Sequence, residues 1–309
     1  MKLWRRIAAV SCAVFMVFAV SGCGDSQGPS GKTVYFASHD VPVDFMASLY
    51  EGVKRQGQEL GLTVEYLDAG LDYNLQMDQV NKAIDSKAAA IVLLPVDSAA
   101  AVPAVERANM AGIPVMATNR DLDGGQFAQV MSDEKQAGTL QGEYMAKHLP
   151  QGAKIVYLMG DASLKAAVLR WEGFKEACLD KRPDVQLLIM QDCGWLETNG
   201  FRTVSMWLNI FPQIDGVIAG NDSMALGALR ALKAAGRDKG VLISGVDALE
   251  PAIKAVATGE MSQTVRQDAD KTAEEIGKLL QEVTSGKIPT ENIKVPFTEI
   301  TRENVAQFR

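Results

Sequence analysis

The sequence of 309 residues is poor in the residues that build metal, redox and nucleotide sites. It has four Cys and two His, with no CxxC or HxxxH spacing, which argues against a zinc site. Neither a GxGxxG nor a GxxxxGK(S/T) motif occurs, so no nucleotide-binding loop is expected. Lys and Arg total 31 against 38 Asp and Glu, which excludes the basic surface that nucleic acid binding requires. We expect no metal, no cofactor and no nucleic acid partner.

Long apolar runs are also scarce, since only one exists, from Ile7 to Val20. Its 14 residues are fewer than the roughly 20 that a spanning helix needs, which excludes a multi-span membrane protein. The run follows three positive charges and ends in Val20-Ser21-Gly22-Cys23, where small residues precede a cysteine. This ending resembles the lipobox of bacterial lipoproteins; the alternative is an ordinary secretory signal with an incidental Cys.

The lipobox resemblance implies that residues 1–22 are a signal peptide and that Cys23 is lipidated. Residues 23–32 then form a flexible polar tether. Loss of the three positive charges changes the formal net charge from −7 to −10. We expect an exported protein, anchored through the lipid on Cys23 to the bacterial membrane, on its periplasmic or outer face.

Two further cysteines remain in the mature chain, Cys178 and Cys193. Cys178 lies near the end of a predicted helix, and Cys193 follows the next predicted strand, at the opposite edge of the sheet. About seven residues of strand at roughly 3.3 Å each separate these edges. A disulfide requires Cα atoms within about 7 Å, so we predict two free thiols.

Short β-branched runs alternate with amphipathic stretches from Thr33 onward, which is typical of parallel sheets covered by helices. About nine strands are too many for one doubly wound sheet of this size. We predict an α/β fold of two doubly wound parallel-sheet lobes. The predicted strands are Thr33–Ser38, Thr63–Asp68, Ala90–Leu94, Pro114–Thr118, Lys154–Met159, Val185–Met190, Gly216–Ala219, Val241–Gly245 and Ser262–Arg266. The predicted helices include Phe45–Leu60, Leu75–Ser86, Ala99–Ala111, Glu134–Leu149, Ala166–Leu179, Ser223–Ala235 and Ala269–Thr284.

Ligands of parallel sheets bind beyond the carboxyl ends of the strands, so the polar residues that follow each strand are the site candidates. Three of these segments carry family-specific patterns. Asn119-Arg120 follows the strand after Gly112-Ile113-Pro114-Val115, Asp247 ends Gly245-Val246-Asp247, and Asn221-Asp222-Ser223-Met224-Ala225-Leu226-Gly227-Ala228 starts a helix. These segments resemble the periplasmic sugar-binding proteins of the ribose/galactose type, which are the receptors of ABC importers, from about Thr33 to Phe297.

The resemblance implies a type I periplasmic binding fold whose two lobes are joined by a three-segment hinge. The N-terminal lobe would comprise residues 33–132 and 268–298, and the C-terminal lobe residues 133–267 and 299–309. It also implies a set of ligand-binding residues at the edges that face each other: Asn119, Arg120, Arg170, Trp195, Asn221, Asp247 and Gln267. The first loop adds the candidates Asp40, Asp44 and Phe45.

The chemistry of this set suits a neutral ring edged with hydroxyls. A carboxylate such as Asp247 can accept from two adjacent hydroxyls, and Arg120 and Arg170 donate in a planar fork. Trp195 and Phe45 offer aromatic faces to the C–H faces of a ring. Four alternatives stay open: Asn119-Arg120 is a surface turn, Arg170 pairs with Glu172 or Glu176 on its own helix face, Asn221-Asp222 caps the next helix, or Trp195 is an ordinary core aromatic.

The first loop departs from the family, because Ser38–Phe45 is longer than the corresponding segment of the ribose binders. Asp40, Asp44 and Phe45 are its candidate contacts. Its acidity suits a highly hydroxylated ring, such as a hexose or inositol, better than ribose.

We therefore expect a monomeric solute-binding lipoprotein that captures a hexose, pentose or inositol and delivers it to the permease of an ABC importer. A sensory receptor that feeds a chemoreceptor or sensor kinase is the alternative. A transcription regulator would need a helix-turn-helix near residues 1–60, where the export signal and tether lie. No catalytic Cys–His pair suggests an enzyme.

Overall fold

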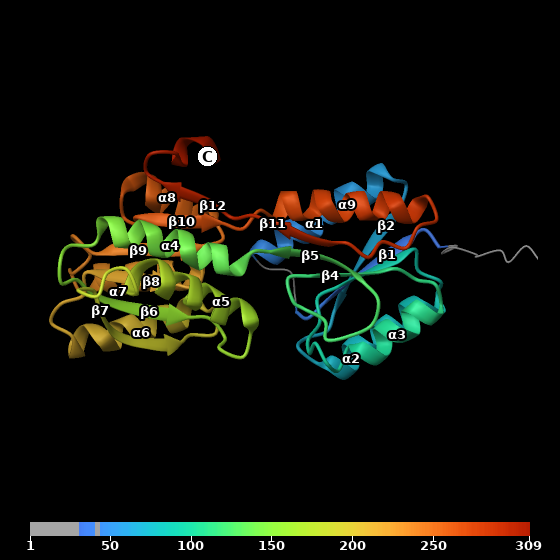
Figure 1. The fold of residues 1–309 in the computed structure, drawn as a ribbon, viewed down its shortest axis with the longest axis horizontal. Coiled ribbons are helices and arrows are strands. Elements are labelled where there is room, and N and C mark those ends of the chain that lie inside the picture. The colour runs from blue at the N-terminus through green and yellow to red at the C-terminus, as the bar shows by residue number, and fades with distance from the viewer. Residues whose placement is uncertain (1–30, 41–43) are drawn as a thin grey trace, which may run out of the picture.

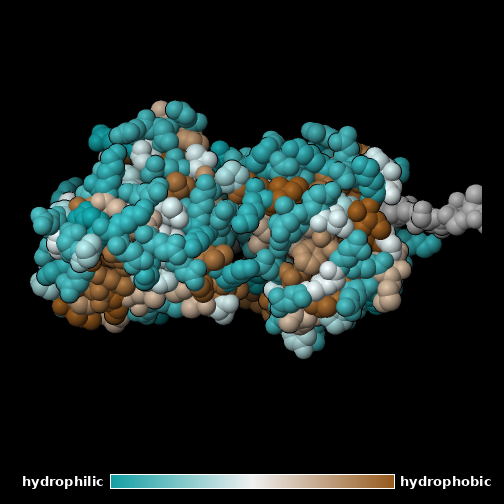
Figure 2. Space-filling view, viewed as in Figure 1, coloured by the Kyte–Doolittle hydropathy of each residue, from teal (hydrophilic) through white to brown (hydrophobic). Residues whose placement is uncertain are grey.

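Two six-stranded sheets, each covered by helices on both faces, form two lobes that lie side by side along the long axis of the molecule (Figure 1). The structure is a computed structural model, and it describes residues 31–40 and 44–309. On the face seen in Figure 2, hydrophilic residues cover most of both lobes. No helix in these two ranges is long and apolar enough to cross a membrane.

The N-terminal lobe is built on a fully parallel sheet with the strand order β11-β5-β4-β3-β1-β2. Its strands are β1 Thr33–Ser38, β2 Thr63–Asp68, β3 Ala90–Leu93, β4 Val115–Thr118, β5 Ala128–Ser132 and β11 Asn292–Val295. Its helices are α1 Asp44–Glu59, α2 Tyr73–Asp85, α3 Val102–Met110 and α9 Ala269–Thr284.

The C-terminal lobe is built on the second sheet, with the order β12-β10-β9-β8-β6-β7, in which only β12 runs antiparallel. Its strands are β6 Lys154–Met159, β7 Gln186–Asp192, β8 Gly216–Ala219, β9 Leu242–Val246, β10 Gln263–Arg266 and β12 Thr298–Thr301. Its helices are α4 Glu134–His148, α5 Lys165–Phe174, α6 Glu197–Ile210, α7 Asp222–Ala234 and α8 Glu250–Thr258, with a π-helix at Lys175–Leu179 and a 3₁₀ turn at Val305–Phe308.

Alternation along the buried strands places a separate hydrophobic core on each face of a sheet. In β1, Val34 and Phe36 pack with the residues of α1 and α9. In β3, Ile91 and Leu93 pack on the opposite side, with α2 and α3. Because every second side chain points to one face, both faces of a strand must be apolar when helices cover both. This requirement explains the continuous apolar runs in the central strands.

The chain passes between the lobes in three short segments. These lie between β5 and α4, between β10 and α9, and between β11 and β12. They run side by side at the centre of Figure 1. The predicted architecture of two doubly wound lobes with a three-segment hinge is therefore confirmed, apart from the antiparallel direction of β12.

Several elements are missing from the predicted set, for two reasons. The strands β5, β11 and β12 have only four or five residues and carry polar residues among apolar ones, as edge and near-edge strands do. The helices α6 and α8 are also absent from the predicted set, and Pro251 near the start of α8 interrupts the helical pattern there. The predicted helix Ala166–Leu179 is interrupted, since its last five residues form the π-helix.

Glycines let α4 and α5 approach each other backbone to backbone. A Cβ atom built on Gly138 would lie 1.8 Å from the carbonyl oxygen of Arg170, and one on Gly173 would lie 2.1 Å from that of Lys135. Real Cβ atoms do not approach so closely, and backbone carbonyls cannot move aside as a flexible side chain can. These two glycines therefore fix the distance between the helices.

We predict that Gly138→Ala lowers the free energy of unfolding by about 1–3 kcal/mol. In an open helix this change would raise stability by up to about 1 kcal/mol, but here the added methyl group forces α4 and α5 apart. Urea unfolding of both variants measures the effect. The control is Gly124→Ala, whose methyl group would meet only Val102 Cγ1 at 3.2 Å. Equal stability of the two variants would contradict the packing argument.

Candidate functional site

Residues that follow the strands of both sheets meet at the junction between the lobes. Gln267 follows β10, and its Nε2 donates to Asn119 Oδ1 across 3.4 Å; Asn119 follows β4 of the other sheet. Lys165 at the start of α5 forms an ion pair of 2.8 Å with Asp121, which also lies beyond β4. The carboxyl ends of the two sheets therefore face one shared region, where ligands of parallel sheets bind.

Arg170 on α5 is the most highly connected side chain at this junction. Its side chain is only 5% exposed. The Nε group donates to Glu134 Oε2 at 2.6 Å and one Nη group donates to the carbonyl oxygen of Gly220 at 2.6 Å. The other Nη group lies 3.4 Å from Gln267 Oε1, and Asp247 Oδ1 lies 3.8 Å from the guanidinium.

The charge of Arg170 is compensated where it is buried. Burial disfavours the charged guanidinium, but the carboxylates of Glu134 and Asp247 outweigh this effect, so the pKa of Arg170 is raised. The guanidinium carbon also lies 5.4 Å from the ring centre of Trp195 and 5.6 Å from that of Phe297. Arg170 therefore stays charged and held from several sides.

Asp222 braces the loop that carries Asp247. The Asp222 carboxylate is fully buried and accepts from Thr264 Oγ1 at 2.7 Å and from the backbone N–H of Leu249 at 2.8 Å. Burial and the nearby carboxylate of Asp247 raise the pKa of Asp222 well above its usual value. The backbone at Asp247 has φ of 113°, a conformation that side chains rarely adopt, so the loop needs this support.

Trp195 lies across the ends of two strands. A Cβ atom on Gly160, directly after β6, would come within 2.2 Å of its ring, and one on Gly220, after β8, within 3.3 Å. Asn221 donates from Nδ2 to the Trp195 carbonyl oxygen at 3.1 Å, while its Oδ1 caps α7 by accepting from the N–H of Met224 at 3.0 Å. Two glycines and one amide thus set the position of the indole.

The N-terminal lobe contributes Asn119 and Arg120. Asn119 adopts φ of 60° at the end of β4, and its Nδ2 donates to Met46 Sδ. Arg120 donates to the carbonyl oxygens of Pro95 and Val96 at 3.2 and 3.3 Å. Burial lowers the pKa of Arg120, an effect that Asp161 from the other lobe opposes.

The first loop is described only in part. Asp40 holds its place through its carbonyl oxygen, which accepts from the Tyr66 hydroxyl, and Phe45 is half-buried against the core under α1. Burial, with Arg120 nearby, lowers the pKa of His39 to about 4, so this imidazole is neutral at pH 7. The side chain of Asp44 lies outside the described residues, as does Cys23.

Comparisons with known proteins identify the family. A sequence model of the periplasmic binding protein domain matches residues 34–288. This chain belongs to that family. The chain is similar to a putative rhizopine-binding protein of Rhizobium meliloti, with 33% identity over 256 residues that cover 81% of this chain and 83% of the relative. It is also similar to a xylitol-binding protein of Mycolicibacterium smegmatis, with 32% identity over 277 residues, or 87% of this chain and 77% of the relative.

A solved structure shares the fold of this periplasmic binding protein domain. It is an ABC transporter solute binding protein from Bacillus halodurans with bound myo-inositol, with a TM-score of 0.83 and 31% identity. The match covers 91% of this chain and 99% of that chain. The resemblance to type I periplasmic sugar-binding proteins, argued above from Asn221–Ala228 and the other motifs, is confirmed.

The structure brings together seven of the predicted ligand residues, although their contacts with a ligand stay predictions. The seven are Asn119, Arg120, Arg170, Trp195, Asn221, Asp247 and Gln267. The capping alternative holds for Asn221, which caps α7, whereas Asp222 braces the loop after β9. Asn221 Oδ1 keeps an oxygen lone pair beyond its cap bond.

Sequence reasoning missed Glu134. The alternative reading paired Arg170 with Glu172 or Glu176 on its own helix face, but the structure pairs it with Glu134 on α4, and Glu176 accepts from Lys135 at 2.9 Å. The partners are far apart in the sequence, and only the glycine contact between α4 and α5 brings them together. A Glu at the first residue of a helix otherwise suggests no more than stabilisation by the helix dipole.

The prediction of two free thiols is confirmed for Cys178 and Cys193, which are both buried and unbridged. They lie in different cores, since Cys178 packs with Met145 and Tyr157, and Cys193 with Val204 and Trp207. A sheet separates the two thiols.

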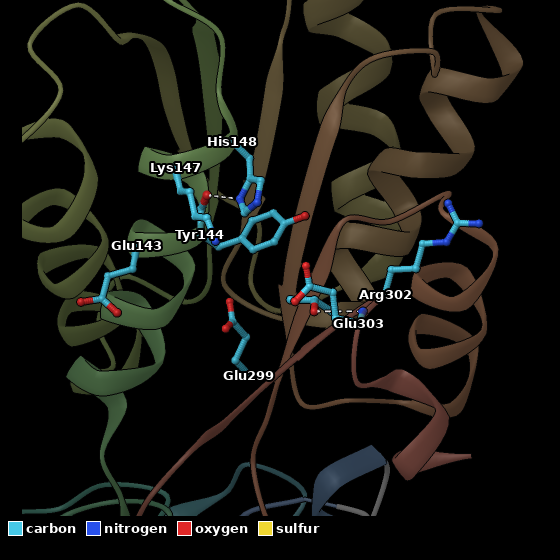
Figure 3. A pocket seen from close by; sticks show the side chains of 8 residues that line it. Glu143, Tyr144, Lys147, His148, Glu299, Arg302 and Glu303 are labelled. Atoms are coloured by element: carbon cyan, nitrogen blue, oxygen red, sulfur yellow. Dashed lines mark hydrogen bonds between the residues drawn. The ribbon is translucent and has the colours of Figure 1, made fainter.

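A pocket of about 240 Å³ lies away from the junction, between the C-terminal end of α4 and the end of β12 (Figure 3). The Tyr144 and His148 rings stack on one side at 4.1 Å. Glu299 on the other side is already engaged, because it accepts from Gln263 at 2.7 Å. Among residues 31–40 and 44–309, no cluster of His, Cys, Asp and Glu could hold a metal ion.

We predict that Asp222 makes the protein less stable as the pH rises. Because its pKa in the folded state is raised, its contribution to the free energy of unfolding is complete below the pKa of the unfolded state and is lost as the pH rises toward the folded pKa. Relative to Asp222→Asn, the wild type should lose more than about 1 kcal/mol between pH 4 and pH 7.

Urea unfolding at both pH values measures this difference. Asp85→Asn is the control, since Asp85 is exposed and pairs with Arg107 on the surface. If the free energy of unfolding changes with pH equally in Asp222→Asn and in the wild type, the raised pKa of Asp222 does not contribute to stability and the prediction is wrong.

Proposed function

We propose that the protein is an extracytoplasmic, lipid-anchored solute-binding protein. It captures one monosaccharide or cyclitol, of the hexose, pentose or inositol class, between its two lobes and delivers it to the permease of an ABC importer. It acts as a monomer and releases its ligand chemically unchanged. Closure is favoured because a ligand in this position contacts both lobes at once.

The compensated charge at the junction carries the proposal. The guanidinium of Arg170 is compensated by the carboxylates of Glu134 and Asp247, the carboxylate of Asp161 acts on Arg120 from the other lobe, and His39 is neutral. A neutral ligand preserves this balance, whereas a charged ligand would leave an uncompensated charge in a region of low water content. The same groups supply forked donors and carboxylate acceptors, which suit adjacent hydroxyls on a ring.

The relatives support the same chemical class. Their names refer to rhizopine, xylitol, apiose and ribose, and the Bacillus halodurans protein holds myo-inositol. Xylitol, ribose and myo-inositol all carry hydroxyls on adjacent carbons. We infer that the ligand of this chain is a polyol with the same feature.

We predict that Arg120→Ala and Asp247→Ala each abolish stabilisation by the ligand and leave the unliganded fold intact. A ligand at one hundred times its Kd stabilises the wild type by about 2.7 kcal/mol, through mass action. Thermal shift with pentoses, hexoses, xylitol and inositols identifies the ligand, and calorimetry then measures Kd for each variant.

Asp85→Ala is the control, because Asp85 is the last residue of α2 and pairs with Arg107 in the same lobe. Unchanged affinity in both Arg120→Ala and Asp247→Ala would refute the assigned site. If amino acids or nucleosides stabilise the wild type and no polyol does, the proposed ligand class is wrong.

We predict that Cys23→Ser releases the protein from the membrane fraction, because the thiol that carries the lipid is lost. Expression in a bacterial host with radiolabelled palmitate measures both membrane association and incorporation of the label. Cys193→Ser is the matched control and should stay anchored, since Cys193 is buried in the C-terminal lobe. Label in Cys23→Ser equal to that in the wild type would contradict the lipid anchor.

A further inference from the structure

Glu134 occupies a position that ties the hinge to the candidate site. It is the first residue of α4 and comes directly after the first inter-lobe segment. Its side chain is 7% exposed, and its Oε2 accepts from Arg170 Nε at 2.6 Å. When a buried carboxylate is paired with a buried guanidinium, removal of either one leaves an unpaired buried charge, which strongly destabilises the protein.

The backbone geometry leaves this pair little freedom. Gly138, one turn after Glu134, lies against the Arg170 carbonyl oxygen, and Gly173 lies against that of Lys135. The Cα atoms of Glu134 and Arg170 are therefore fixed relative to each other. Because the Cα of Arg170 is fixed and its Nε is bonded to Glu134, only the direction in which its two Nη groups point can still vary.

That direction runs toward the second inter-lobe segment. One Nη group bonds to the Gly220 carbonyl oxygen, and the other lies 3.4 Å from Gln267 Oε1. Gln267 Nε2 in turn donates at 3.1 Å to Oγ of Ser132, the last residue of β5, directly before the first segment. Glu134, Arg170, Gln267 and Ser132 thus form a chain of contacts that connects the second hinge segment with both ends of the first.

We propose that Glu134 is a positioning residue: it holds Nε of Arg170 so that the Nη groups face the ligand, and it links Arg170 to the hinge. The proposal rests on the proposed function, in that Arg170 is taken to contact the ligand. Without the Glu134 carboxylate, the nearest charged partner of Arg170 is Asp247, at 3.8 Å. Arg170 then turns to Asp247 and occupies the acceptor that ligand hydroxyls need.

The test uses Glu134→Gln, which keeps an oxygen acceptor of nearly the same shape and removes only the charge. Glu172→Gln is the matched control, because Glu172 is an exposed residue of α5 near Arg170 and undergoes the same change of charge. Two quantities are measured in the full-length protein: Kd for myo-inositol, xylitol and D-ribose by calorimetry, and the ¹⁵N NMR signal of Arg170 Nε in the unliganded state.

In Glu134→Gln we expect Kd to rise about tenfold to a hundredfold, as for loss of a charge-assisted hydrogen bond. We also expect the Arg170 Nε signal to shift, with neither change in Glu172→Gln. Arg170→Lys, which lacks the Nε donor, should make Kd insensitive to Glu134→Gln, since a positioning residue acts only through its partner.

The two measurements separate the possible failures. An unchanged Arg170 signal in Glu134→Gln overturns the positioning role, whatever the protein binds. A shifted signal with an unchanged Kd also overturns it, because the orientation of Arg170 would then not matter for binding. If the wild type binds none of these three ligands, and no pentose, hexose or inositol stabilises it in the thermal-shift screen, the proposed function fails, and the NMR signal alone decides whether Glu134 orients Arg170.

Discussion

A charged guanidinium that is buried between two lobes needs nearby carboxylates to balance its charge. Arg170 obtains this balance from Glu134 at 2.6 Å and from Asp247 at 3.8 Å, on elements that follow different strands and segments. Desolvation of an unpaired cation would cost several kcal/mol. The positions of α4, of the loop after β9 and of the second hinge segment are therefore mutually dependent. Arg170 contacts all three.

The supporting structure is made to hold these few side chains in place. Asn119, Trp195 and Asp247 all have positive φ, at 60°, 66° and 113°, although none is a glycine. Such conformations cost free energy and persist where surrounding contacts enforce them. Asp222 supplies these contacts for the loop of Asp247, and Gly160 leaves room for the ring of Trp195. Strain and a buried carboxylate thus accompany the residues that the sequence motifs single out.

The sequence predicts what depends on local pattern. Apolar runs and their spacing locate the central strands, and residues just after them, such as Asn119, Asn221 and Asp247, are found because parallel strands end at one edge. The pairing of Glu134 with Arg170 is not predicted, because it depends on a contact between two helices. The spacing of the glycines allows this contact but does not identify the two helices that make it. The short strands β5, β11 and β12 are not predicted for a related reason. Their pairing depends on how the chain returns from one lobe to the other, which is not a local pattern.

A crystal structure of the protein with a polyol that stabilises it would test the proposed site most directly. We expect a ligand between the two sheets, within hydrogen-bond distance of Arg170 and Asp247 in one lobe and of Asn119 or Arg120 in the other, with the ring beside Trp195. A ligand that contacts one lobe only, or that lies in the pocket beside Tyr144 and His148, would contradict it.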